Sequence, residues 1–249
     1  MVSFYDTSTI FMIVAIIGIL ITGISKSGFA GGSGVVAVPL LALLIPISHA
    51  VIIVLPLLII MDIKTIHYYY KNMDFKEVMQ IIPAALFGII IGGLLLGTFD
   101  EHHLQFWFGA ICIIFASWQG LAPIFSKIKG AAMLWGCISG ITSTLIHSGA
   151  PPFNIYMISR GLPKKTWLAT AGLFFFVMNC VKIIPYSLIG EWSSAMLWTS
   201  LLLVPVALLG TYLGKLMQHY VSEKLFVSLC RLFLFLSGGL LIYKGIAPI

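Results

Sequence analysis

The chain has 249 residues, a formal net charge of +6, 60% hydrophobic residues and only 9% charged residues. Ordinary globular domains contain about 25% charged residues, so this composition excludes a soluble domain with a single core. The basic residues lie in short segments between apolar runs, which is typical of a membrane protein and not of a nucleic-acid-binding one. The composition therefore predicts an all-α polytopic membrane protein.

Apolar segments follow one another along the whole chain. The expected membrane segments are 9–25, 34–46, 49–70, 77–98, 103–125, 131–147, 150–160, 164–189, 193–215 and 223–246. Most of them are long enough to cross a hydrocarbon layer of about 30 Å. Segments 34–46 and 150–160 are too short to cross it with ease. Each is therefore expected to be a half-helix that meets the preceding segment at membrane depth and forms a re-entrant hairpin.

The two halves of the chain resemble each other at an offset of 117 positions. Glycines and prolines coincide at this offset: Gly23 with Gly140, Gly32 with Gly149, Pro46 with Pro163, Gly93 with Gly210 and Gly97 with Gly214. Because these residues shape the backbone, the coincidences favour an internal repeat over chance. We expect a first repeat over residues 1–125, a cytoplasmic linker at 126–130 and a second repeat over residues 131–249, each with five segments.

The loop charges predict how the segments are oriented. Four loop regions, 64–77, 126–130, 160–165 and 215–224, carry ten Lys and Arg residues, whereas the remaining loops and the two termini carry one, Lys244. Cytoplasmic loops are enriched in Lys and Arg, so the four basic regions are expected in the cytoplasm and both termini outside. The first repeat then starts from outside and the second from inside, which makes the repeats inverted in the cytoplasmic (inner) cell membrane.

A polar, glycine-rich break opens each repeat, at GISKSGFAGGSGVVAVP (23–39) and at GITSTLIHSGAPPFNIY (140–156). Inverted repeats with broken helices are typical of secondary transporters. The start of a half-helix carries partial positive charge and N–H donors, which favour an anion. The candidate anion-binding residues at the two breaks are Ser25, Lys26, Ser27, Gly31, Gly32, Ser33, Thr142, Ser143, His147, Ser148, Gly149 and Asn154.

Three basic residues fall inside apolar segments, where a charge costs about 2.5–3.5 kcal/mol or more. Lys26 either attracts an anion beside the glycine break or snorkels to the interface. Lys182 either lines a cavity or forms an ion pair inside the bundle, for instance with Asp62. Arg231 is interpreted as structural or interfacial.

Asp62 and Asn179 occupy equivalent repeat positions and are expected to line a central cavity together. Asp62 either carries a coupling proton or is a carboxylate neutralised by Lys182 or Lys26. His147 either donates to an anion or titrates, or it is a packed residue with satisfied hydrogen bonds. One or two of the hydroxyl groups near the second break are expected to bond back to their own helix.

No motif predicts a metal, a cofactor or a reaction. The four cysteines are isolated within apolar runs, so neither a metal site nor a disulfide framework is expected. No HExxH pair, paired catalytic aspartates or nucleophile elbow is present in the sequence, which disfavours an intramembrane enzyme. An anion channel built on the same repeat remains an alternative to the transporter.

The motifs GFAGGSGVVAVP (28–39) and HSGAPPFNIY (147–156), each followed by an LIP or GLP turn (44–46 and 161–163), resemble the sulfite exporter TauE/SafE family of membrane permeases. The resemblance covers nearly the whole chain. One departure is Ala-Pro-Pro after Gly149, where the family more often has further glycine before a proline. The resemblance implies a transporter, mostly an exporter, of sulfite, thiosulfate or a sulfur-containing organic anion.

Proton coupling is expected for such a transporter, and the expected partners are a small anion and the lipid bilayer. A permease for a non-sulfur organic anion is the further alternative. The oligomeric state is open between a monomer and a homodimer.

Overall fold

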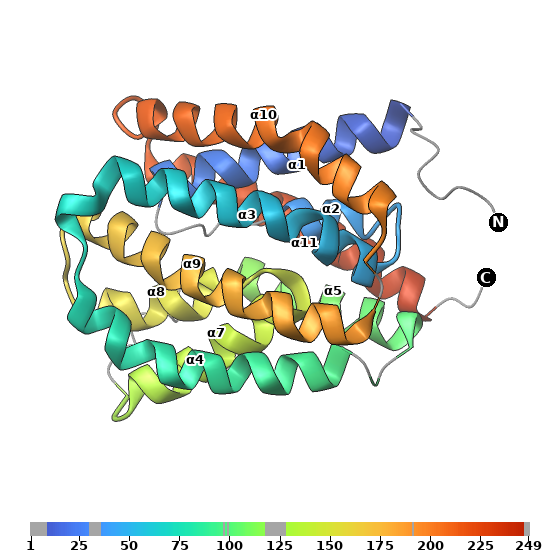
Figure 1. The fold of residues 1–249 in the computed structure, drawn as a ribbon, viewed down its shortest axis with the longest axis horizontal. Helices are drawn as coiled ribbons and strands as arrows, with labels where there is room; N and C mark the ends of the chain where they lie inside the picture. The colour runs from blue at the N-terminus through green and yellow to red at the C-terminus, as the bar shows by residue number, and fades with distance from the viewer. Residues whose placement is uncertain are drawn as a thin grey trace.

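The computed structural model describes residues 9–29, 36–96, 98, 100–117, 128–190 and 192–246. Within these ranges every regular element is a helix (Figure 1). The elements are α1 (Thr9–Gly28), α2 (Ala37–Leu41), α3 (Ile47–Tyr69), η1 (Tyr70–Asn72), α4 (Phe75–Leu96), α5 (Glu101–Ser117), α7 (Ala131–Ile146), α8 (Ala150–Ile158), α9 (Lys164–Ile189), α10 (Ser194–Met217) and α11 (Glu223–Ile246). The predicted all-α architecture is confirmed, and most helix boundaries agree with the expected segments.

The first short segment is the main exception. Helix α2 covers only five residues, Ala37–Leu41, and not the whole expected segment 34–46. Pro39 has no N–H group to donate, and beyond Leu41 the chain closes tight turns such as Leu44 N–H to Leu41 O. Residues 30–35, which include the predicted anion-binding residues Gly31, Gly32 and Ser33, lie outside the described part of the chain.

Six of the described helices are long and apolar enough to cross a membrane: α1, α3 with η1, α4, α9, α10 and α11. Helices α5 and α7 are apolar but shorter. Large apolar side chains cover the outside of the bundle, for example Leu188, which is 83% exposed, and Trp198, which is 64% exposed. Hydrocarbon can cover such a surface because the helical backbone satisfies its own hydrogen bonds. The protein is therefore a multi-pass membrane protein.

Helix pairs join the two halves of the chain. Helix α1 packs along α10 and α4 along α7, while α3 meets α9 and α5 meets α11. Glycines lie at the crossings of the first two pairs: a Cβ atom on Gly23 would lie 3.0 Å from Gly210 Cα, and one on Gly140 would lie 2.9 Å from Gly88 Cα. Small residues at such crossings are typical of packed membrane helices. Under the predicted repeat the α1–α10 pair is equivalent to α7–α4, although the repeat and its inversion stay predictions.

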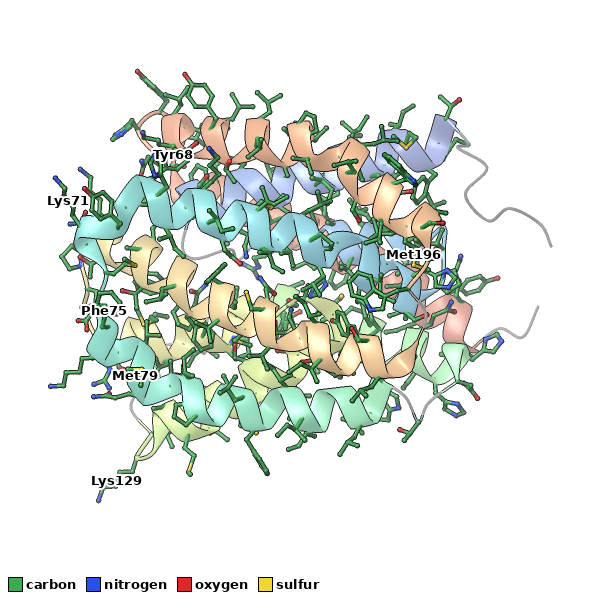
Figure 2. The ribbon with its side chains drawn as sticks, in the orientation of Figure 1. Tyr68, Lys71, Phe75, Met79, Lys129 and Met196 are labelled. Carbon is green, nitrogen blue, oxygen red and sulfur yellow. The ribbon has the colours of Figure 1, made fainter. Side chains whose placement is uncertain are left out.

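The loops lie at the two ends of the bundle. Figure 1 places the α3–α4 and α8–α9 connections at one end, and the start of α1 and the end of α11 at the other. Figure 2 shows Lys71 and Lys129 at the first end and Met196 at the opposite one. Lys244 Nζ donates to Leu43 O at 2.8 Å, so the turn after α2 lies with the C-terminal helix. We call the first end, where the basic loops gather, the basic end.

Candidate functional site

The second predicted break is present between α7 and α8, since α7 ends at Ile146 and α8 begins at Ala150. His147 adopts a left-handed backbone conformation with φ of 53°. The N–H groups of His147 and Ser148 donate to Ser143 O and Thr142 O, which closes the end of α7. A left-handed residue with a side chain is uncommon and persists only where its surroundings hold it.

The side-chain contacts of His147 stabilise this left-handed conformation. Its Nε2 atom lies 2.8 Å from Val51 O in α3, and its Nδ1 atom lies 2.7 Å from Lys182 Nζ in α9. Since a carbonyl oxygen only accepts, we assign the ring hydrogen to Nε2. Nδ1, which also lies 3.2 Å from Ser143 O, is then the acceptor of a Lys182 N–H group. In this assignment the imidazole is a neutral ring held between a backbone carbonyl and a buried amine.

Lys182 is fully buried. Its Nζ donates to Ser143 O at 3.1 Å, to Ser143 Oγ at 3.0 Å and to His147 Nδ1 at 2.7 Å. An ammonium group has three N–H donors, so these acceptors use all of them. The ion pair between Lys182 and Asp62, one of the two alternatives from the sequence, is not formed because Asp62 has a different partner.

That partner is Lys26. Its Nζ lies 2.5 Å from Asp62 Oδ1, and the two side chains are only 6% and 1% exposed. Asn179 Nδ2 donates to the second carboxylate oxygen, Oδ2, at 2.6 Å. Asp62 and Asn179 are thus in direct contact, and the expectation that they line a central cavity together stays a prediction. The alternative that Lys26 snorkels to the interface is wrong, because the carboxylate draws its ammonium into the bundle.

These two groups of contacts are neighbours. Asn179 and Lys182 lie on one face of α9, at a spacing of three residues. Lys26 and Asp62 lie close enough to Lys182 to act on it electrostatically. We call the set the core cluster, which consists of Lys26, Asp62, Ser143, His147, Asn179 and Lys182. It joins α1, α3, α7 and α9.

Other predicted residues make contacts elsewhere. Thr142 Oγ1 bonds back to Ile138 O at 2.8 Å, which is the expected fate of one or two hydroxyl groups. Ser27 Oγ donates to Thr211 O of α10 at 2.7 Å. Asn154 Oδ1 accepts from Trp167 Nε1 at 3.2 Å, between α8 and α9. Ser25 and Ser148 are buried, and the Gly149 carbonyl accepts from Ser139 Oγ at 2.7 Å.

The start of α8 offers fewer N–H donors than the sequence suggested. Pro151 and Pro152 have none, and the N–H of Phe153 donates to Gly149 O. A row of backbone N–H groups therefore contributes little beside this break, and the basic side chain that contacts the end of α7 is Lys182.

Tyr186 is a neighbour of the core cluster that the sequence pattern did not single out. Its hydroxyl donates to Thr144 O at 2.5 Å, and its ring centroid lies 5.8 Å from that of His147. Tyr186 follows Lys182 by four residues on α9, so the helical spacing of polar groups was a signal that could have found it.

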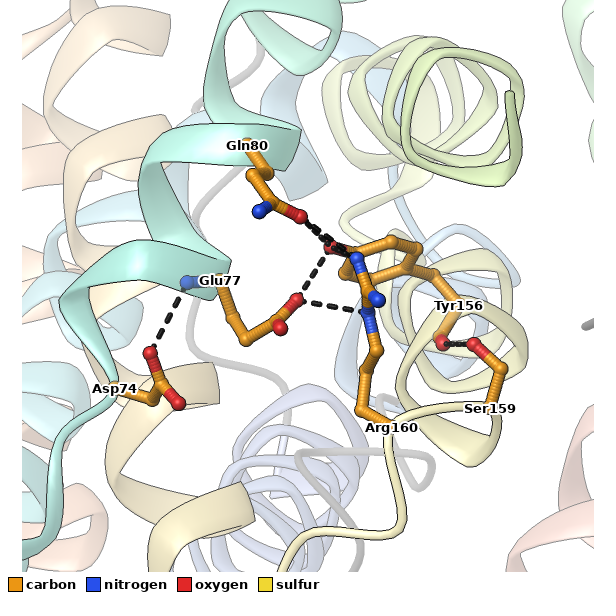
Figure 3. Close-up of polar contacts among 6 residues, drawn as sticks. All are labelled: Asp74, Glu77, Gln80, Tyr156, Ser159 and Arg160. Carbon is orange, nitrogen blue, oxygen red and sulfur yellow. Dashed lines mark hydrogen bonds and ion pairs between the residues drawn. The ribbon is translucent and has the colours of Figure 1, made fainter. Parts of the chain in front are cut away.

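A second polar cluster ties α4 to the end of α8 at the basic end (Figure 3). Arg160 Nε lies 2.9 Å from Glu77 Oε2, and Tyr156 donates its hydroxyl hydrogen to the same oxygen at 2.5 Å. Arg160 Nη2 also donates to Gln80 Oε1 at 2.7 Å. We call Glu77, Gln80, Tyr156 and Arg160 the end cluster.

The family profile described as "Sulfite exporter TauE/SafE" matches residues 14–241. The chain belongs to the TauE/SafE family. The TauE/SafE match includes every residue of the core cluster and of the end cluster. A curated relative, "Probable membrane transporter protein YunE" of Bacillus subtilis (strain 168), is 25% identical over 277 residues, which cover 95% of this chain and 98% of the relative. No solved structure matches the chain.

As a TauE/SafE protein, the chain is a membrane transporter. The groups that its core cluster offers are two lysine side chains, an imidazole, a hydroxyl, an amide and one carboxylate. Charged donors bind oxyanions more strongly than neutral ones. The chemistry of this TauE/SafE cluster therefore suits an anion.

Proposed function

We propose that the protein is a secondary transporter that exports a small anion, such as sulfite, thiosulfate or an organosulfur anion, with proton coupling. The observation that carries the proposal is the core cluster, in which two lysines and one carboxylate are buried beside a helix break. Ionisable residues inside membrane helices mark substrate or ion pathways. Membership of a transporter family supports translocation as the reason for these charges.

In this proposal the anion binds between the two breaks, near the middle of the membrane. Lys26 is the charge that attracts it, while Ser143 and His147 present polar groups from the second break. The remaining predicted residues of the breaks, among them Gly31, Gly32 and Ser33, belong to the same proposed site.

Asp62 is the proposed carrier of the coupling proton. Its carboxylate holds the Lys26 ammonium at 2.5 Å, so substrate and carboxylate compete for one cation. Protonation of Asp62 removes its negative charge and weakens the ion pair, which favours the substrate. This competition gives coupling a physical cause.

We also propose that the basic end faces the cytoplasm of the inner membrane, with both termini outside. The support is the excess of Lys and Arg in the loops at that end. A cysteine introduced at Lys129 and modified by an impermeant reagent only after the membrane is opened would support this orientation. Modification in intact cells would contradict it.

The test of the site is the flux of radiolabelled sulfite and thiosulfate into liposomes that contain the purified protein. Lys26→Ala and His147→Ala are each expected to abolish saturable flux. Lys26→Ala also leaves Asp62 without its cation, so the double variant Lys26→Met with Asp62→Asn is the matched control that removes both charges. Normal flux in this double variant would show that Lys26 only neutralises Asp62 and would overturn the assignment.

The same liposomes separate a transporter from a channel. A transporter saturates at low substrate concentration and shows no unitary conductance in planar bilayers. Unitary currents carried by the anion would establish the channel instead.

A further inference from the structure

The charges of the core cluster do not cancel. Among the described residues, the buried side chains with a formal charge are Lys26, Asp62 and Lys182. Lys26 and Asp62 neutralise each other at 2.5 Å. Asp62 uses its second oxygen for Asn179, which is neutral. Lys182 is the remaining residue with a formal charge, and it has no carboxylate partner in the cluster.

No carboxylate of the described residues is in hydrogen-bond contact with Lys182. All three acceptors of its N–H groups are uncharged: a backbone carbonyl, a hydroxyl and the Nδ1 atom of His147. His147 contributes no charge in the assigned tautomer, in which Nε2 carries the single ring hydrogen toward Val51 O. The break at residues 30–35, AGGSGV, has no ionisable side chain in the sequence. With Lys182 as an ammonium and His147 neutral, the cluster carries one net positive charge.

Uncompensated charge at membrane depth is costly. A singly charged anion brings the net charge of the cluster to zero. A doubly charged anion of the same size leaves one negative charge in excess, and the group that can remove it is Asp62. Its protonation deletes one negative charge and frees the Lys26 ammonium.

We propose that the core cluster enforces a charge rule: a monoanion binds alone, and a dianion binds only together with one proton on Asp62. The rule rests on the proposed function and deepens it, since it limits proton coupling to doubly charged substrates and gives the reason for that coupling. The positive charge of Lys182 determines how much negative charge the cluster accepts from the substrate. Protonation of Asp62 raises that amount by one.

Among the residues that the structure describes, few titratable or polar groups face Asp62. Lys26 approaches from α1, and Asn179 approaches from α9. Lys182 and Cys180, also on α9, interact with Asp62 electrostatically, and His147 of α7 reaches it through Lys182. Protonation of Asp62 is therefore controlled by two lysines that the substrate also approaches.

Calorimetric binding of methanesulfonate and sulfate to the purified protein tests the rule. These anions have similar size and shape, they carry one and two negative charges, and neither titrates near neutral pH. Titrations in two buffers of different ionisation enthalpy report the protons taken up per anion bound. The native protein is expected to take up no proton with methanesulfonate and one with sulfate. Sulfate affinity should then rise about tenfold for each unit of falling pH, as one linked proton requires.

Two substitutions change the net charge of the core cluster in opposite directions and should change the number of protons taken up accordingly. Asp62→Asn raises the net charge by one, so sulfate should bind without proton uptake and be preferred over methanesulfonate by about tenfold or more. Lys182→Met lowers the net charge by one, so methanesulfonate should bind only with one proton. If either residue had only a structural role, its substitution would weaken the binding of both anions alike and leave the number of protons taken up per anion unchanged.

Arg231→Met is the matched control. Arg231 is another cation within an apolar helix, but its Nε donates to Ala116 O between α11 and α5, outside the core cluster. Its removal should leave both proton counts as in the native protein. Size-exclusion profiles confirm that each variant is folded.

The outcomes separate the two proposals. Sulfate binding without proton uptake by the native protein, or proton-free methanesulfonate binding by Lys182→Met, overturns the charge rule while anion transport stands. A native protein that transports sulfur anions but binds neither test anion also overturns the rule. A native protein that neither binds nor transports any anion overturns the proposed function itself.

Discussion

The core cluster and the end cluster use similar chemical groups in different surroundings. In the core cluster the ion pair of Lys26 and Asp62 is 6% and 1% exposed, whereas in the end cluster Arg160 and Glu77 are 34% and 13% exposed. Water screens the second pair and reaches its charges when the pair opens. The first pair has lost its hydration, so each charge depends on its protein partner. Breaking the ion pair should therefore lower the free energy of unfolding strongly in the core cluster and only slightly in the end cluster.

The largest effect is expected for Lys26→Ala. It leaves the Asp62 carboxylate buried without its cation, which costs about 3–5 kcal/mol of unfolding free energy. Thermal unfolding of the detergent-purified protein measures this loss. The variant with Lys26→Met and Asp62→Asn should be close to the native protein, because paired removal leaves neither member of the pair charged without its partner. Equal stability of the single variant and the native protein would contradict the comparison.

A smaller loss is expected for His147→Ala. The substitution removes the acceptor of one Lys182 N–H group and the donor to Val51 O, which costs about 1–3 kcal/mol. His147→Asn should lose less, because Asn tolerates the left-handed backbone better than other residues with a side chain. Unfolding of the two variants side by side separates the backbone effect from the side-chain effect, and a larger loss for Asn would argue against this account.

Tyr186→Phe should have a still smaller effect. It removes the hydroxyl that donates to Thr144 O but keeps the ring beside His147. Loss of one hydrogen bond costs about 0.5–1.5 kcal/mol. Thermal unfolding and anion binding are both measured, and unchanged binding is the expected result. A binding defect as large as that of His147→Ala would place Tyr186 in the site itself.

The smallest effect is expected in the end cluster. Combining Glu77→Gln with Arg160→Met in a double-mutant cycle should give a coupling free energy of about 0–1 kcal/mol, since the pair is partly exposed. Added salt should reduce that coupling further by screening. A coupling as large as that between Lys26 and Asp62, or one insensitive to salt, would show that the end cluster is not a surface contact.

The sequence predicted the helical architecture well because composition and the length of apolar runs determine it. It also brought Asp62 and Asn179 together, since the offset of 117 between the halves equals their separation in sequence and the structure joins them directly. The repeat offset thus carried information on a contact that neither residue carried alone.

The choice of partners could not be predicted. Lys26 and Lys182 were equal candidates for Asp62, and only the packing of α1 and α9 against α3 decides between them. Likewise Thr142 and Ser143 are adjacent hydroxyl residues, yet the rotation of α7 turns one back to its own helix and the other toward Lys182. Such differences depend on helix rotation, which no local pattern of residue types reports.

The most direct test of the central claim compares two paired substitutions in liposomes. One removes Lys26 and Asp62 from the core cluster as Lys26→Met with Asp62→Asn, and the other removes Arg160 and Glu77 from the end cluster as Arg160→Met with Glu77→Gln. Radiolabelled thiosulfate flux should be lost in the first and close to native in the second. Native flux after neutralisation of the core pair would contradict the claim that this pair handles the anion.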